Sequence, residues 1–99
     1  MISYQRQAAI VRAMAHPVRQ ILQALVDHPA CVCELQAATG RRHAYVSQQL
    51  SILRAMGLVK GEKEGLQVRY CLTWPDTAKL LKIIRLVGAR CLEQRKGDR

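Results

Sequence analysis

The spacing of the apolar residues changes once along this chain, and the change limits the folds open to it. Up to Gly57, apolar residues recur every three or four positions, which is the period of an amphipathic helix. Leu58 and Val59 open a strand, and over residues 66–72 apolar residues alternate with other residues, as in a strand with one buried face. Helical spacing returns in 77–92. This order predicts one mainly α-helical domain, residues 1–99, that carries a single β-hairpin.

Proline and glycine divide the helical part of the sequence. The predicted helices cover 3–15, 18–26, 34–39, 44–56 and 77–92. Pro17 suits a helix start because it has no amide donor to lose, and Gly40 and Gly57 suit helix ends because glycine adopts the left-handed conformation there. The hairpin turns at 62–65, and its second strand has an apolar face formed by Leu66, Val68, Tyr70 and Leu72. Residues 93–99 are charged and are predicted to form a frayed tail.

Charge and length restrict the partners. The chain has 16 Lys and Arg against 7 Asp and Glu, a net charge of +9, and this balance favours a phosphate-rich partner. Its 99 residues leave little room for a catalytic pocket, so we expect neither an enzyme nor a small-molecule substrate. No apolar run reaches the ~20 residues that cross a membrane, and the polar first residues do not resemble a signal peptide. We therefore expect a cytoplasmic protein without a membrane partner.

The order short helix, glycine turn, longer helix and hairpin is that of a winged helix-turn-helix. The longer helix, 44–56, is about 20 Å long, and the major groove of DNA, ~12 Å wide, admits one helix. Glutamine suits adenine, tyrosine can reach a thymine methyl or a phosphate, and basic side chains suit phosphates. The predicted DNA-binding residues are Arg41, Arg42, His43, Tyr45, Ser47, Gln48, Gln49 and Arg54 with the wing residues Lys63 and Arg69.

Four cysteines in a reducing compartment indicate metal or redox chemistry rather than disulfides. Cys31 and Cys33 are two residues apart, a spacing that puts both side chains on one face of an extended segment but not of a helix. We therefore predict Cys31 in an extended segment and Cys33 at the N-cap of the helix 34–39, where the helix dipole favours a thiolate. Thiolates prefer soft metals, so Cys31 and Cys33 are the candidate metal ligands.

Four blocks of this sequence resemble the ArsR/SmtB family of metal-sensing repressors: Met14–Leu22, Cys31–Leu35, Val46–Val59 and the wing Gly65–Leu72. The similarity covers about residues 10–72 and combines several motifs. It implies a homodimeric winged helix-turn-helix repressor that dimerises through its first and last helices. It also implies that the repressor leaves its operator DNA when an inducer binds.

The Cys31-Val-Cys-Glu-Leu segment is similar to the Cys-Val-Cys-Asp-Leu metal box of arsenic, cadmium and lead sensors. The resemblance implies As(III) or Sb(III) as inducer, with Cd(II), Pb(II) and Zn(II) as alternatives. A trigonal thiolate site needs a third donor, for which Cys91 and Cys71 are the candidates. Glu34 replaces the aspartate of the box, and a third box cysteine is missing. The last helix lacks the His and Asp residues of the zinc and nickel sensors.

Other functions stay open on the sequence alone. The cysteines could instead sense oxidants or persulfides in a DNA-binding repressor, or could serve only in packing. A basic RNA-binding module and a dithiol oxidoreductase are weaker alternatives. The oxidoreductase lacks support because no βαβ pattern surrounds the cysteine pair.

Overall fold

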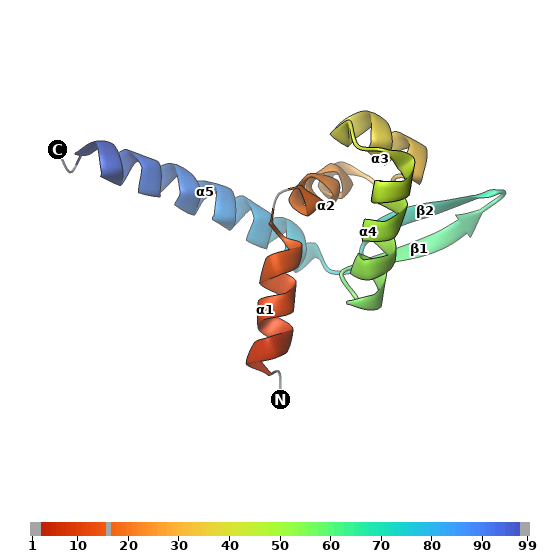
Figure 1. Cartoon of the computed structure of the whole chain (residues 1–99), viewed down its shortest axis with the longest axis horizontal. Coiled ribbons are helices and arrows are strands. Elements are labelled where there is room, and N and C mark those ends of the chain that lie inside the picture. Colours follow the sequence, from red (N-terminus) through yellow and green to blue (C-terminus); the bar gives the residue numbers. More distant parts are fainter. Residues whose placement is uncertain (1–2, 16, 98–99) are drawn as a thin grey trace.

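Three helices and a hairpin surround an aliphatic core, and two further helices project from it (Figure 1). The computed structural model describes residues 3–15 and 17–97, with only the backbone described for 94–97. The elements are α1 (Tyr4–Ala13), α2 (Val18–Asp27), α3 (Val32–Thr39), α4 (His43–Ala55), β1 (Val59–Glu64), β2 (Gln67–Leu72) and α5 (Pro75–Gly97). This is the predicted winged helix-turn-helix.

The core forms where the helical apolar stripes meet. α2 contributes Ile21, Leu22 and Leu25, α3 contributes Leu35, α4 contributes Val46, Leu50 and Leu53, and all are buried. Leu81 of α5 closes the cluster. Gly40, at φ +71°, ends α3 in the left-handed conformation and turns the chain into α4. Burial of these aliphatic side chains fixes α4 against α3 and leaves the opposite face of α4 exposed.

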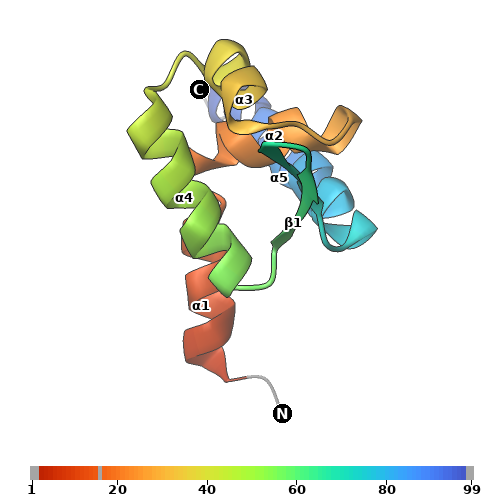
Figure 2. The same ribbon diagram turned by 90° about the vertical axis from the view of Figure 1, so that its right-hand side faces the viewer.

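The hairpin is attached to the core and to the segment that precedes α3. β1 and β2 pair antiparallel, with Gly61 opposite Tyr70. Ala30 forms an isolated bridge with Tyr70, with N···O distances of 2.9 and 2.8 Å. In Figure 2 the segment between α2 and α3 accordingly passes beside the hairpin. Leu66, predicted on the apolar face, lies instead in the tight turn and is fully exposed, because Gly65 and Leu66 form the loop between the strands.

The boundaries of α3 and α5 differ from the prediction. α3 begins at Val32 rather than residue 34, because Cys31 already has the extended backbone of an N-cap residue. α5 begins at Pro75, as proline suits a first helical position, and it stays helical through Gly97 where a frayed tail was predicted. The stretch 91–96 contains no proline or glycine to end it earlier. His16, which precedes the predicted helix start at Pro17, lies outside the described residues, and so do residues 98–99.

The projecting helices expose apolar side chains. Tyr4 and Val11 are exposed on α1, and Ile83, Leu86, Val87 and Leu92 are exposed on α5. In Figure 1 the two helices leave the core in different directions. Within residues 3–15 and 17–97, no helix combines the length and apolar character needed to cross a membrane.

Candidate functional site

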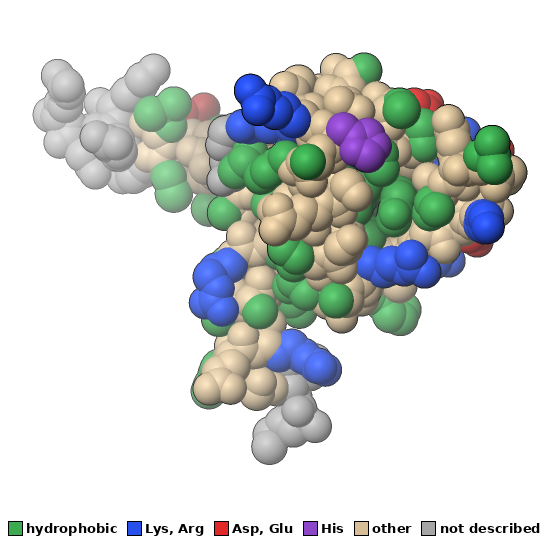
Figure 3. Space-filling model, turned by 45° about the vertical axis from the view of Figure 1, so that its right-hand side comes forward, with side chains coloured by type: hydrophobic (Ala, Val, Ile, Leu, Met, Phe, Trp, Pro, Cys, Tyr) green, Lys and Arg blue, Asp and Glu red, His purple; other side chains and the backbone are tan. Residues whose placement is uncertain are grey.

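The exposed face of α4 carries most of the side chains predicted to contact DNA. His43, Gln48 and Arg54 are exposed, whereas Tyr45, Ser47 and Gln49 are partly exposed between the buried positions. On the face seen in Figure 3, Lys and Arg side chains lie around the edge, and the middle is covered by uncharged side chains and backbone with a His side chain among them. This distribution suits a helix whose centre meets base edges and whose surroundings meet phosphates.

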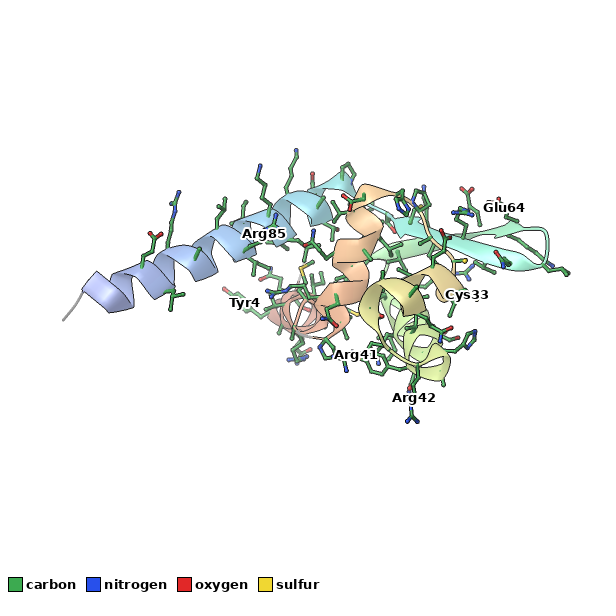
Figure 4. The ribbon with its side chains drawn as sticks, turned by 90° about the horizontal axis from the view of Figure 1, so that it is seen from above. Tyr4, Cys33, Arg41, Arg42, Glu64 and Arg85 are labelled. Carbon is green, nitrogen blue, oxygen red and sulfur yellow. The ribbon has the colours of Figure 1, made fainter. Side chains whose placement is uncertain are left out.

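The N-terminus of α4 adds a further concentration of positive charge. Arg42 is the N-cap residue, and its side chain makes no capping hydrogen bond to the amides of the first turn. Arg42 projects away from the body of the protein (Figure 4). The Arg41 guanidinium lies 5.9 Å from the ring centre of Tyr45, within range of a cation–π contact. Free helix amides and two arginines together form a surface that attracts a phosphate.

The wing differs from the prediction in the placement of one arginine. Lys63 is exposed near the hairpin turn. Arg69, in contrast, donates from Nε to Glu64 Oε2 at 3.0 Å and from Nη1 to the Pro29 carbonyl at 3.2 Å, and Nη1 lies 3.4 Å from Glu34 Oε1. The hydrogen bond to Glu64, followed by the charges of Glu64 and Glu34, raises the pKa of Arg69. Arg69 is therefore engaged within the protein and does not point freely toward solvent.

The two candidate ligand cysteines lie at the start of α3, where Cys31 has the predicted extended backbone but Cys33 lies inside the helix. Cys31 is the N-cap residue and is buried, with 8% of its surface exposed. Cys33 is the second helical residue and is exposed, so the prediction of Cys33 as the N-cap is wrong. The Cys31 amide donates to Glu34 Oε1 at 3.1 Å, and this bond is the main reason that the pKa of Glu34 lies below its ordinary value. The carboxylate thus caps a helix whose N-cap lies two residues earlier than predicted.

A cleft of about 220 Å³ lies between the cysteines, the wing and the start of α4, which is the predicted DNA-recognition helix. It is lined by Cys31, Val32, Cys33, His43, Leu66, Gln67, Val68 and Tyr70. Cys33 lies on the side of α3 nearest the hairpin (Figure 4). His43 is the first residue of α4, so the cleft adjoins the beginnings of both helices.

The other two cysteines lie elsewhere. Cys71 pairs with Lys60 across the hairpin and is partly buried, and Cys91 is exposed on α5. Within residues 3–15 and 17–97 of a single chain, no three His, Cys, Asp or Glu side chains are grouped closely enough to hold a metal ion. The described part of one chain thus brings Cys31 and Cys33 together but supplies no third donor beside them.

The capping role of Glu34 and the partners of Arg69 were not predicted from the sequence. Glu34 follows Cys31 by three residues, which is the spacing of a capping box, so a local signal existed. The contact between Arg69 and Glu34 spans 35 positions and left no signal of that kind.

Comparison with known proteins agrees with this geometry. The family described as "Bacterial regulatory protein, arsR family" matches residues 18–60. The HTH-type transcriptional regulator Rv0081 of Mycobacterium tuberculosis is 37% identical over 94 residues, covering 93% of this chain and 82% of that protein. This chain belongs to the arsR family. The same species' regulator CmtR is 43% identical over 84 residues, or 83% of this chain and 71% of CmtR.

Solved structures of arsR-like proteins have the same fold. The crystal structure of M. tuberculosis Rv0081 matches with a TM-score of 0.84, over 93% of this chain and 94% of that one. The solution structure of Mb0332 from Mycobacterium bovis, described as a homodimeric winged helix-turn-helix DNA-binding domain, is 30% identical. It matches with a TM-score of 0.79 over 91% of this chain and 84% of that domain. The arsR-family chain is therefore a DNA-binding transcriptional regulator rather than an enzyme.

Proposed function

We propose that this arsR-family regulator is a homodimeric repressor that leaves its operator DNA when a thiophilic metal or metalloid ion, such as As(III) or Sb(III), binds Cys31 and Cys33. One observation carries the proposal. Both cysteines lie at the start of α3, and they line a cleft that also reaches His43, where the recognition helix begins. A regulator of this kind acts in the cytoplasm, where the DNA is.

α4 is the element that enters the major groove. Its buried residues hold it against α3, and its polar face is free to read bases. The proposed contacts are Arg41, Arg42, His43, Tyr45, Ser47, Gln48, Gln49 and Arg54, with Lys63 from the wing. Among them, Arg41, Arg42 and Lys63 supply charge for phosphates, and the two glutamines are suited to adenine.

Dimerisation uses the apolar side chains of α1 and α5. Ile83 and Val87 are four residues apart and therefore lie on one face of α5, where both are about half exposed. An exposed apolar stripe on a helix of a small domain favours burial against a second chain. The homodimeric state described for Mb0332 supports this assembly. A dimer presents two α4 helices, which must match half-sites about one DNA turn, ~34 Å, apart.

The ligand site follows from the chemistry of the thiols. Soft thiolates select soft ions, which favours As(III) or Sb(III), with Cd(II), Pb(II) and Zn(II) as alternatives. Cys33 lies in the first turn of α3 and is exposed, so an ion can reach its sulfur. A three-thiolate ion requires a further donor, and Cys91 is the leading candidate because α5 lies at the proposed dimer contact. Cys71 is the other candidate.

Release of DNA follows from movement of α3. Drawing the buried Cys31 and the exposed Cys33 around one ion changes the start of α3, and α3 packs against α4 in the core to which Leu35 and Leu50 belong. A changed α3 alters the direction of α4 and therefore the spacing of the two recognition helices. A coupling free energy of about 3 kcal/mol is enough to lower operator affinity more than 100-fold.

A second candidate function keeps the DNA binding but replaces the ion by thiol oxidation or persulfide formation. The exposure of Cys33 favours it, because oxidants and persulfides reach accessible thiolates. In this alternative a reversible modification at Cys31 or Cys33 releases the DNA.

The test begins with selection of an operator sequence from random duplex DNA by the reduced, purified protein. Fluorescence anisotropy then measures release of the labelled operator by arsenite, antimonite, Cd(II) and Pb(II). We expect arsenite or antimonite to release it. Operator binding that persists unchanged with all four ions contradicts the ion proposal. Release by mild oxidation, together with a Cys31 or Cys33 modification seen by mass spectrometry, then favours the second candidate.

A further inference from the structure

Arg69 connects the wing to the segment that carries the cysteines. Its guanidinium bonds to Glu64 within the wing, and across the gap it reaches the Pro29 carbonyl and Glu34. Pro29 and Glu34 flank Cys31 on either side in the sequence. One side chain of β2 thus holds both sides of the segment that leads into α3.

A backbone bridge lies at the same place. The amide of Ala30 donates to the Tyr70 carbonyl at 2.9 Å, and the amide of Tyr70 donates to the Ala30 carbonyl at 2.8 Å. Tyr70 follows Arg69 in β2, and Ala30 precedes Cys31. The wing is therefore attached to the cysteine segment by one backbone bridge and by the contacts of Arg69.

We infer that Arg69 is a positioning residue that holds the wing in the orientation needed for operator binding, and that the Glu34–Arg69 pair links the state of Cys31 to that orientation. The first part depends only on the DNA-binding function of the family. The second part rests on the proposed function of the cysteines.

Arg69 is poorly placed to serve as a phosphate contact. Two of its three guanidinium nitrogens already hold three acceptors, and two of these are carboxylates. The side chain is 38% exposed and that of Glu34 is 46% exposed. To bind a phosphate, Arg69 would have to give up these partners, and Glu34 and Glu64 would then repel the same phosphate. Lys63, exposed in β1, has no ion-pair partner among the described residues.

Glu34 makes the connection to the cysteines direct. The same oxygen, Oε1, accepts from the Cys31 amide at 3.1 Å and lies 3.4 Å from Nη1 of Arg69. An ion that draws Cys31 and Cys33 together moves the backbone amide that Glu34 caps. Displacement of Glu34 changes its distance to Arg69, so the disturbance reaches β2 without passing through the core.

Salt dependence of operator binding distinguishes a positioning residue from a phosphate contact. Loss of one phosphate contact reduces the slope of log K against log salt by about 0.9. Because the homodimer carries two copies of Lys63, for Lys63→Gln, the matched control in the wing, we expect a reduction of about 1.8. For Arg69→Gln we expect affinity to fall about 3- to 10-fold with the slope unchanged, because a half-exposed ion pair contributes modestly. A slope for Arg69→Gln that falls as much as for Lys63→Gln overturns the inference.

Two conservative variants give an independent test, because the two roles of Arg69 predict opposite changes in operator affinity. Glu34→Gln can still cap the Cys31 amide but loses its charge. If Arg69 binds phosphate, this variant releases Arg69 and strengthens operator binding; if Arg69 positions the wing, it weakens binding. Asp27→Asn is the control, because Asp27 is exposed in α2 and makes no ion pair within the described residues, and its neutralisation should not weaken binding. Arg69→Lys should behave like Arg69→Gln, because lysine lacks the planar geometry that holds three acceptors.

Amide hydrogen exchange provides a readout that DNA does not affect. In the free protein, Arg69→Gln should speed exchange of the Tyr70 amide while the amides of buried α4 residues stay protected. Unchanged protection of Tyr70 overturns the positioning role. Thermal melting of each variant separates a loosened wing from loss of the fold.

The link to the cysteines is tested with arsenite. In Arg69→Gln, arsenite should bind the free protein as in the wild type but reduce operator affinity by a smaller factor. An equal factor in both proteins overturns the link alone. A wild-type protein that ignores arsenite refutes the proposed ion function, while the salt-slope and exchange results still decide whether Arg69 positions the wing.

Discussion

Gly61 allows the two strands of the wing to pack tightly, and its replacement by alanine gives a sharp prediction. Gly61 lies opposite Tyr70 in the hairpin. A Cβ atom at this position would lie 2.8 Å from Cγ1 of Val68 and 3.1 and 3.3 Å from two carbons of the Tyr70 ring. The first distance is shorter than real Cβ contacts allow, so the neighbours must move. Tyr70 is the residue whose backbone carries the bridge to Ala30, which limits how far it can move.

The magnitude follows from the packing. Adding a methyl group to a closely packed site costs about 1–3 kcal/mol, and each kcal/mol lowers the melting temperature of a domain of this size by roughly 4–8 °C. We therefore expect Gly61→Ala to melt roughly 5–20 °C below the wild type. Because the wing is displaced, operator affinity should also fall. The variant keeps the net charge, so the salt slope should stay unchanged.

The assay is thermal melting followed by circular dichroism at one fixed protein concentration, since dimerisation makes the midpoint concentration-dependent. The control is Val68→Ala, alone and combined with Gly61→Ala. Removing the Val68 methyl groups relieves the 2.8 Å contact, so the double variant should be less destabilised than the sum of the two single variants. A Gly61→Ala protein that melts together with the wild type refutes this packing argument.

Three further predictions concern α3. Leu35→Ala should lower the free energy of unfolding in urea by about 2–5 kcal/mol, because Leu35 of α3 is fully buried in the core that α3 shares with α2 and α4. A loss typical of surface positions contradicts that placement. Gly40→Ala should lower stability by about 1 kcal/mol through its positive φ alone, since no atom lies within 4 Å of the added Cβ, and Gly40→Asn should lose less. The pKa of Glu34 lies below its ordinary value of 4.5, so the stability it contributes is present above pH 4.5 and is lost as the pH falls below that value. In Glu34→Gln the free energy of unfolding should fall less steeply with pH below 4.5 than in the wild type. An identical fall in both proteins would refute the stabilising role of the Glu34 carboxylate.

Periodicity was sufficient to predict the elements that position the site. α2 and α4 have apolar residues on one face and polar residues on the other, and each was predicted to within a residue or two. The apolar residues Val46, Leu50 and Leu53 of α4 recur at helical spacing, and all three are buried. These features are determined by neighbours along the helix, so the sequence contains them directly.

Periodicity could not predict the first residue of α3 or the partners of Arg69. Cys31 is an uncommon N-cap residue, so the cap was assigned two residues late. Alternation along β2 predicted a polar face for Arg69 but not which groups it meets. Those groups, Pro29 and Glu34, come from a segment 35 to 40 positions away that the tertiary fold brings to the edge of β2. Alternation also placed Leu66 in the strand, whereas the position of Gly65 puts it in the turn.

Release of operator DNA by arsenite in the four single Cys→Ser variants tests the central claim most directly. Cys31→Ser should fold normally, because serine is a favoured N-cap residue, and each variant should bind operator as the wild type does without arsenite. The account predicts that Cys31→Ser and Cys33→Ser hold the operator at arsenite concentrations that release the wild type, and that Cys71→Ser is released normally. Release of both Cys31→Ser and Cys33→Ser at the wild-type concentration would contradict it.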